Sequence, residues 1–294
     1  MNDEREYSFE DPRAALKRHG LAPKHSWGQN FLVSSKAVAR ISSACASVSP
    51  SRIIEIGAGL GTLTAALLDV GVPVTAVERD RDMCSVLRSD FGESPRFTLL
   101  EGDAAKVDYR ALLGTEKGVL TGNLPYQITG RLLRAVVDTV DCLCRAVVMV
   151  QEEVAERLAA APSTSPRGAL SVIVQARFAV KIAVRLKPTA FFPPPKVRSA
   201  VLTLDPLEES PLAAARVSAA LFDAVVNAAF TARRKTIRNS LAASGLGLVP
   251  REVETLLESA NINPTRRSET LSVQEFAKLS HCASLQSIPS LLHR

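Results

Sequence analysis

The sequence predicts an α/β protein in which helices cover both faces of a parallel sheet, with a small helical domain after the sheet. Three observations predict it. Short β-rich runs alternate with helical stretches over residues 52–151, which is the pattern of repeated βαβ units. The β-rich runs are almost continuously apolar, as buried parallel strands are. After Pro206 the β-rich runs stop and helical patterns take over.

The pattern of each segment places the elements in order. Five strands are predicted at residues 52–56, 72–78, 96–100, 118–122 and 146–150, and the helices between them at 60–70, 80–91, 128–137 and 152–161. A stretch rich in Pro, Ser and Gly at 161–168 predicts a loop. Two later β-rich runs, 170–186 and 197–204, are expected to add antiparallel strands at a sheet edge. Helices follow at 212–243, 251–260 and 273–279. We therefore expect an N-terminal extension at 1–23, a sheet domain at 24–206 and a helical domain at 207–294.

Composition narrows the class of protein. The chain has 294 residues, 46% hydrophobic and 22% charged, which suits a globular protein with a large core. A formal charge of +6 favours acidic partners, with nucleic acid first among them. The five cysteines form no CxxC pair, so we expect reduced thiols in a cytoplasmic protein. We expect neither a signal peptide nor a membrane span, and no residue spacing suggests a metal site.

Glycines and carboxylates stand where the predicted strands end. The first strand runs into Gly57, Gly59 and Gly61, which permit a tight turn and close approach of the backbone to a ligand. Glu78 ends the second strand, where it can accept hydrogen bonds from ribose hydroxyls, and Asp103 follows the third, placed for an adenine amino group. Each feature alone is ordinary for a sheet rim. Three of them at successive strand ends predict a nucleoside-binding site.

The fourth strand is followed by Asn123, Leu124, Pro125 and Tyr126. An exocyclic adenine amine is a poor nucleophile because its lone pair is delocalised into the ring. The Asn123 side-chain carbonyl and the Leu124 or Pro125 backbone carbonyl can bind both amine hydrogens and favour a pyramidal nitrogen. Tyr126 offers a face on which an extruded base can stack. A strand ending in an ordinary turn with a core tyrosine is the alternative.

The second half of the chain supplies recognition candidates. Phe191, which precedes a proline-rich turn, is expected to form a second stacking face, although a core role is an equal alternative. Residues 181–240 hold 10 basic and 4 acidic side chains, a local balance of +6. This excess predicts a phosphate-binding surface, against the alternative of a solvated helix face. The candidates are Lys196, Arg198, Arg233, Arg234, Lys235 and Arg238.

Together these motifs resemble one family, the small-subunit ribosomal RNA adenine N6,N6-dimethyltransferases. They are residues 24–32, 55–64 (EIGAGLGTLT), 77–80 (VERD), 101–103 (EGD), 122–126 (GNLPY), 191–200 (FFPPPKVRSA) and 233–241 (RRKTIRNSL). The resemblance implies a Rossmann-like, S-adenosylmethionine-dependent methyltransferase with a helical RNA-binding domain. Its implied substrate is a pair of adjacent adenosines near the 3′ end of the small-subunit RNA, methylated during ribosome assembly. We expect the protein to act as a monomer. By position it implies cofactor contacts from Asn30, Leu32, Gly57, Glu78, Asp103 and Asn123.

Two alternatives to this function stay open. The related large-subunit RNA dimethyltransferases that confer macrolide resistance share the QNFL and NxPY motifs, whereas Gly28 and the RRKTIRNSL segment favour the small-subunit group. A chiefly non-catalytic assembly factor is the second alternative. The presence of Glu78, Asp103 and the NLPY motif argues against lost catalysis.

Overall fold

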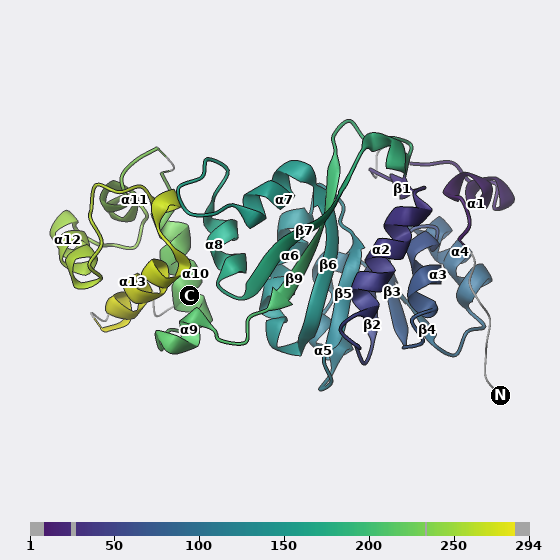
Figure 1. Ribbon diagram of the computed structural model, residues 1–294, viewed down its shortest axis with the longest axis horizontal. Helices are drawn as coiled ribbons and strands as arrows, with labels where there is room; N and C mark the ends of the chain where they lie inside the picture. Colours follow the sequence, from purple (N-terminus) through teal and green to yellow (C-terminus); the bar gives the residue numbers. More distant parts are fainter. Residues whose placement is uncertain (1–8, 25–27, 233, 286–294) are drawn as a thin grey trace. The chain divides into compact units, whose positions relative to one another are not determined.

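A seven-stranded sheet dominates the computed structural model, which describes residues 9–24, 28–232 and 234–285 (Figure 1). Its strands are β2 Ile53–Ile56, β3 Val74–Glu78, β4 Phe97–Glu101, β5 Gly118–Asn123, β6 Leu143–Gln151, β7 Phe178–Leu186 and β9 Ser199–Pro206. They lie in the order β4-β3-β2-β5-β6-β9-β7. The strands from β4 to β6 are parallel, and β9 pairs antiparallel with β6. The predicted α/β class is confirmed.

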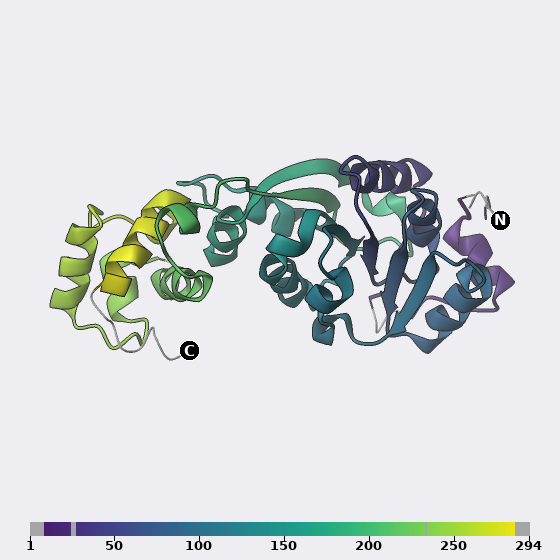
Figure 2. The ribbon, with the colours of Figure 1, turned by 90° about the horizontal axis from the view of Figure 1, so that it is seen from below.

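Helices lie on both faces of the sheet (Figure 2). They are α2 Ser35–Ala46, α3 Thr62–Leu68, α4 Arg81–Phe91, α5 Tyr109–Leu113, α6 Thr129–Asp138 and α7 Glu152–Ala159. The helix α2 buries Ala37, Val38, Ile41 and Cys45, spaced along one face as an amphipathic helix requires. These side chains pack with strand residues such as Ile53 in one core cluster. Within the described residues, short 3₁₀ helices are also present at Ala104–Lys106, Val140–Cys142, Pro188–Ala190 and Ser268–Thr270.

The chain forms two compact units. The first comprises Met1–Ala155 with Lys181–Pro206, and the second comprises Glu156–Val180 with Leu207–Arg294. The helices of the second unit are α8 Ala169–Gln175, α9 Pro211–Ala214, α10 Ala219–Ala229, α11 Ile237–Ala242, α12 Pro250–Ser259 and α13 Val273–Leu285. The prediction assigned 156–180 to the sheet domain. This segment instead joins the helices, because α8 packs on α10 and Arg177 pairs with Asp223 at 2.9 Å.

One predicted strand is half helix. The run at 170–186 is rich in β-branched residues, yet its first part forms α8 and only its second part forms β7. The Ser171 hydroxyl accepts from the Gly168 N–H at 3.0 Å and donates to the Arg157 carbonyl, which fixes the first turn of α8. Burial of Val172 and Val174 then outweighs their intrinsic preference for strands.

The single helix predicted at 212–243 is three helices. The chain breaks at Arg216, which has a φ of 54°, and Ser218 then begins α10 by accepting from the Leu221 N–H. Thr236 begins α11 in the same way, by accepting from the Asn239 N–H. Short polar side chains at these positions favour helix starts over helix interiors.

The N-terminal extension contains the helix α1 Pro12–Arg18, which belongs to the first unit. Ala15 and Leu16 pack with Phe31 and Leu60 in a small apolar cluster. Beyond it, β1 Phe31–Leu32 pairs antiparallel with β8 Phe191–Phe192. No helix in the described ranges is long and apolar enough to span a membrane.

Candidate cofactor and target-base site

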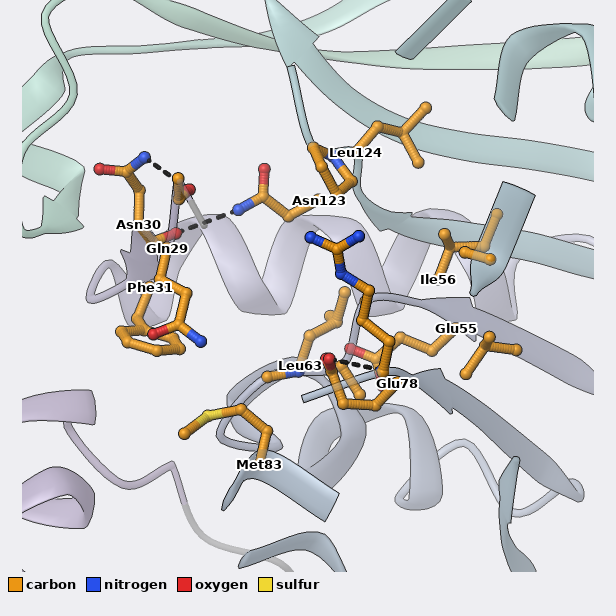
Figure 3. Close-up of a pocket in the computed structure, with 18 of the residues that line it drawn as sticks. Gln29, Asn30, Phe31, Glu55, Ile56, Leu63, Glu78, Met83, Asn123 and Leu124 are labelled. Atoms are coloured by element: carbon orange, nitrogen blue, oxygen red, sulfur yellow. Dashed lines mark hydrogen bonds between the residues drawn. The ribbon is translucent and has the colours of Figure 1, made fainter. Parts of the chain in front are cut away.

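A cavity of about 310 Å³ opens at the carboxyl ends of the parallel strands (Figure 3). The sheet order runs outward from β2 to β3 and β4 on one side and from β5 to β6 on the other. Ligands of open α/β sheets bind at such a reversal. Ten of the predicted residues line the cavity: Asn30, Leu32, Gly57, Gly59, Glu78, Asp103, Asn123, Leu124, Pro125 and Tyr126.

The glycine turn after β2 allows close packing against neighbouring side chains as well as close approach of a ligand to the backbone. Gly59 and Gly61 have φ angles of +56° and +78°, which favour glycine. A Cβ on Gly61 would lie 2.3 Å from Cε2 of Phe91, and one on Gly59 would lie 3.2 Å from Cε1 of Phe31. The turn therefore holds its backbone close both to the helix α4 and to the wall of the cavity.

The Glu78 carboxylate is 9% exposed and accepts hydrogen bonds from three backbone N–H groups. Its Oε2 accepts from the Gly59 N–H at 2.9 Å. Its Oε1 accepts from the N–H groups of Arg79 at 2.8 Å and Asp80 at 2.9 Å. Glu78 thus braces the glycine turn while it lines the cavity, a second role that its position in the sequence did not reveal.

Asp103 lies just beyond β4 and begins the short helix Ala104–Lys106. Its Oδ1 accepts from the Ala105 N–H at 3.0 Å. This bond holds the carboxylate at the rim of the cavity, where it contributes negative charge to the lining.

Asn123, the last residue of β5, has a fixed side-chain amide. Its Nδ2 donates to the Asn30 carbonyl oxygen at 3.1 Å, and Figure 3 shows the amide oxygen directed away from that bond. An amide has one donor end and one acceptor end, so holding the donor also orients the acceptor. The Asn123 Oδ1 atom has no donor among the described residues and is available to a ligand amine.

The two backbone carbonyls next to Asn123 differ in whether they already accept a hydrogen bond. The Pro125 oxygen accepts from the Ile128 N–H at 3.1 Å and from the Thr129 hydroxyl at 2.9 Å. The Leu124 oxygen has no donor within the described part of the chain. The structure therefore separates the two carbonyls that the sequence left as alternatives.

Tyr126 lines the cavity with its ring half-buried. Its hydroxyl lies 3.1 Å from the Ser199 hydroxyl at the start of β9. This contact ties the wall of the cavity to the segment that follows the proline-rich turn.

The assignment of Phe191 to a stacking face is wrong. Its side chain is 2% exposed, belongs to the main core cluster and does not line the cavity. Its backbone pairs with Leu32 in the β1–β8 ladder, and the core role was the other alternative. The adjacent Phe192 is more exposed and lies beneath the Arg13 guanidinium, 5.4 Å from Cζ to the ring centroid.

Glu55, to which the sequence analysis gave no role, lies in β2 at 2% exposure and lines the cavity. The Thr64 hydroxyl donates to its Oε2 at 2.5 Å. Burial, reinforced by the nearby charge of Glu78, raises the pKa of Glu55 to about 8. The carboxyl is therefore protonated at neutral pH. A charged residue inside the apolar run IIEI was the signal that could have found it.

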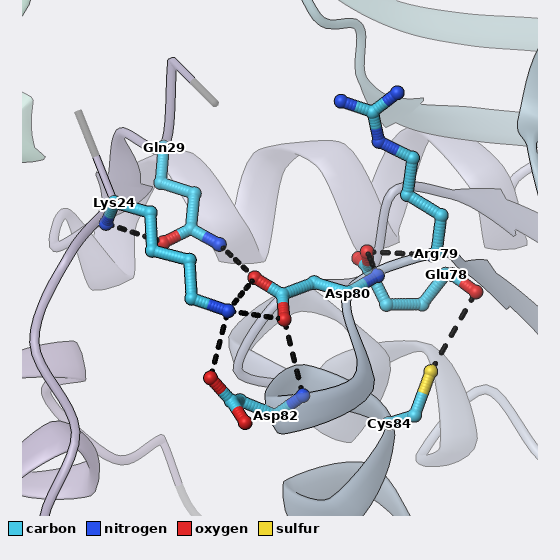
Figure 4. A network of polar contacts seen from close by, with 7 residues as sticks. All are labelled: Lys24, Gln29, Glu78, Arg79, Asp80, Asp82 and Cys84. Atoms are coloured by element: carbon cyan, nitrogen blue, oxygen red, sulfur yellow. Dashed lines mark hydrogen bonds and ion pairs between the residues drawn. The ribbon is translucent and has the colours of Figure 1, made fainter. Parts of the chain in front are cut away.

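A polar network anchors the N-terminal segment beside the cavity (Figure 4). The Lys24 ammonium donates to Asp80 at 2.7 Å and pairs with Asp82 at 2.7 Å. The Gln29 amide also donates to Asp80 at 2.7 Å, and its oxygen accepts from the Lys24 N–H. Asp80 is 2% exposed, so this network holds residues 28–30 against the turn that follows Glu78.

The predicted phosphate-binding residues fall into different settings. Arg234 and Lys235 are exposed on a turn between α10 and α11, not on a helix as expected. Arg238 pairs with Glu254 at 2.7 Å, and Arg198 pairs with Glu152 at 2.8 Å. Lys196 is exposed. Arg233 lies outside the described residues. The described ranges contain no group of three or more His, Cys, Asp or Glu side chains that could hold a metal ion.

The fold and the cavity define a Rossmann-like methyltransferase: a parallel sheet with an added antiparallel edge, a glycine turn after β2 and carboxylates at the ends of the next two strands. The chain belongs to the ribosomal RNA adenine dimethylase family, whose sequence profile matches residues 20–284.

Individual proteins to which the chain is similar are named as ribosomal RNA or adenosine methyltransferases. The chain is 43% identical over 281 residues to a ribosomal RNA small subunit methyltransferase A from Anaeromyxobacter, covering 92% of this chain and 97% of that protein. It is 41% identical over 271 residues to the protein of that name from Myxococcus xanthus, covering 92% and 94%. A dimethyladenosine transferase from Plasmodium falciparum matches with a TM-score of 0.71 at 25% identity, covering 85% of this chain and 95% of that one.

Proposed function

We propose that this chain transfers methyl groups from S-adenosylmethionine to the N6 amines of two adjacent adenosines near the 3′ end of the small-subunit ribosomal RNA. Membership of the dimethylase family gives the reaction class. The orientation of the Asn123 amide is the observation that carries the proposal, because it presents a carbonyl acceptor to a ligand amine. Relatives at 41–43% identity named for the small subunit support the choice of RNA.

The lining of the cavity fits S-adenosylmethionine. Glu78 and Asp103 offer carboxylate acceptors to ribose and adenine donors. Phe31, Leu63 and Met83 give one part of the wall an apolar character that suits an adenine ring. The neutral Glu55 carboxyl adds no further negative charge beneath Glu78. When bound, this cofactor supplies an electrophilic methyl group on a sulfonium.

The residues after β5 would activate the target amine. The Asn123 Oδ1 and the Leu124 carbonyl oxygen would each accept a hydrogen bond from one amine N–H, which would localise the nitrogen lone pair and direct it toward the methyl donor. The Pro125 carbonyl is already bonded to Ile128 and Thr129, so we assign the second acceptor to Leu124. These acceptors act most strongly where the amine becomes cationic, in the transition state.

Tyr126 would stack on the target adenine, since its ring lines the cavity and its hydroxyl is held by Ser199. Base stacking on an aromatic ring contributes about 1–3 kcal/mol. In the second unit, the exposed Arg234 and Lys235 would bind RNA phosphates, together with Arg233 and Arg238. The small ribosomal subunit is the proposed partner, engaged by a monomer in the cytoplasm.

Methylation mapping tests this function. The chain is incubated with labelled S-adenosylmethionine and either immature small subunits or large subunits, and the methylated bases are mapped. We expect label on two adjacent adenosines near the 3′ end of the small-subunit RNA and none in large subunits. Label confined to large-subunit RNA would overturn the proposed substrate. Asn123→Ala is the matched control, because it retains the cavity but lacks the amine acceptor.

A further inference from the structure

Basic side chains form a row on the outer strands of the sheet, and only two of them, Lys196 and Arg198, were phosphate-binding candidates in the sequence. Residues 157–204 contain no aspartate or glutamate. Along β7 and the residue after it, exposed positions alternate with positions of lower exposure. The exposed ones are Lys181, Ala183, Arg185 and Lys187. Val184 and Leu186 point the other way, into the core cluster that includes α2.

The neighbouring strand extends this charge. Lys196, Val197 and Arg198 precede β9 and are all exposed, with Val197 at 43%. An exposed aliphatic side chain between two cations suits a surface that contacts sugar or base as well as phosphate. We call the set Lys181, Arg185, Lys187, Lys196 and Arg198 the β7–β9 stripe.

The partly buried carboxylate of Glu152 pairs with two members of the stripe. Glu152 pairs through Oε1 with Arg185 Nε and through Oε2 with Arg198 Nε, each at 2.8 Å. The Glu152 side chain is 18% exposed, whereas those of Arg185 and Arg198 are 45% and 53% exposed. A guanidinium has five N–H donors, so a bond through Nε to Glu152 leaves donors on Arg198 for a second anion. The three lysines of the stripe, Lys181, Lys187 and Lys196, are exposed and keep this surface positive.

One end of the stripe adjoins a residue that contacts the cavity wall. Arg198 directly precedes Ser199, whose hydroxyl contacts that of Tyr126 in the cavity wall. The Arg198 carbonyl also accepts from the Glu152 N–H at 3.0 Å. We therefore expect the phosphates that flank a base bound beside Tyr126 to lie near this surface.

We propose that the β7–β9 stripe binds the sugar–phosphate backbone of the RNA strand that carries the target adenosine. The inference rests on the proposed function, and it adds a contact surface on the catalytic unit that is separate from the Arg234–Lys235 turn. Arginine presents paired donors that match phosphate geometry, and Glu152 sets Arg185 and Arg198 side by side for this purpose. Lys181, Lys187 and Lys196 have no acidic partner within the described ranges and add charge along the strand.

The test compares two double variants with equal charge loss. Lys181→Ala/Lys187→Ala removes two stripe cations that make no ion pair. Lys36→Ala/Arg40→Ala removes two exposed cations from α2, on the opposite face of the sheet. Binding to small subunits that lack the methylation is measured across a salt series, with S-adenosylmethionine affinity and methyl incorporation measured on the same proteins.

Each phosphate contact contributes a slope of about 0.7–0.9 to the salt dependence. Losing two contacts should flatten the slope by about 1.4–1.8 and weaken subunit binding about 25- to 60-fold at about 0.1 M salt. Cofactor affinity and the α2 control should stay at wild-type values. An unchanged slope in the stripe variant, or an equal loss in the control, would overturn the proposal. Failure of the wild type to methylate small subunits would instead refute the proposed function, and the methyl-incorporation readout separates the two cases.

Discussion

Replacing Glu78 by alanine should damage both stability and cofactor binding, and the structure supplies the magnitude. The carboxylate accepts from three backbone N–H groups, those of Gly59, Arg79 and Asp80. Arg79 is exposed, so water replaces its lost bond. The buried Asp80 donor would be left unsatisfied at a cost of about 1–3 kcal/mol, and the half-buried Gly59 bond contributes about 0.5–1.5 kcal/mol. The sum is a loss of about 1.5–4.5 kcal/mol in the free energy of unfolding.

Asp103→Ala is the matched control for Glu78→Ala, because it removes a single backbone bond, to Ala105. Its stability loss should be about 0.5–1.5 kcal/mol. Calorimetric titration should show weaker S-adenosylmethionine binding for both variants, and scanning calorimetry should show the larger destabilisation for Glu78→Ala alone. Equal unfolding stability of the two variants would refute the bracing role of Glu78. Wild-type cofactor affinity in both would show that the ligand binds elsewhere.

Four further predictions concern single residues. Asn123→Ala should abolish methyl transfer while subunit binding persists, and a single-turnover rate within a few-fold of wild type would exclude its acceptor role. Tyr126→Phe should be mild and Tyr126→Ala should lose about 1–3 kcal/mol of stacking, measured as subunit affinity. Phe191→Ala should instead lower the free energy of unfolding by about 3–5 kcal/mol, because its ring is in the core. A normal unfolding midpoint for that variant would return Phe191 to the pocket. Glu55 keeps its proton in the folded state up to a pKa of about 8 and loses it near 4.5 when unfolded. Wild-type stability should therefore fall as pH rises between these values, by up to about 1.4 kcal/mol per pH unit from this one group. Glu55→Gln should flatten that slope, and an identical pH profile would contradict the assignment.

The sequence by itself determined the sheet and the position of the cavity. Apolar runs and their alternation with helices depend on local periodicity, and each predicted strand of the parallel sheet is present within three residues of its expected ends. Carboxyl ends of parallel strands share one edge. For that reason Gly57, Glu78, Asp103 and Asn123 were expected at one site before any tertiary contact was known.

Tertiary packing decided which hydrogen bonds those residues make. Neither the Asn30 carbonyl that orients Asn123 nor the bracing of Gly59 by Glu78 follows from spacing, since each joins segments that meet only in the folded chain. Tertiary packing also decided the secondary structure of the segment that forms α8. Its valines favour a strand locally, but burial against α10 selects a helix.

Local sequence patterns could not predict which of the neighbouring residues Phe191 and Phe192 is buried. Both are aromatic and precede the same prolines, so composition cannot tell which one faces the core. The β1–β8 register pairs Leu32 with Phe191 and Phe31 with Phe192, and side chains alternate between the two faces of a strand. A shift of one residue would exchange them. Only the pairing of two segments about 160 residues apart in the chain buries Phe191 and leaves Phe192 nearer the surface.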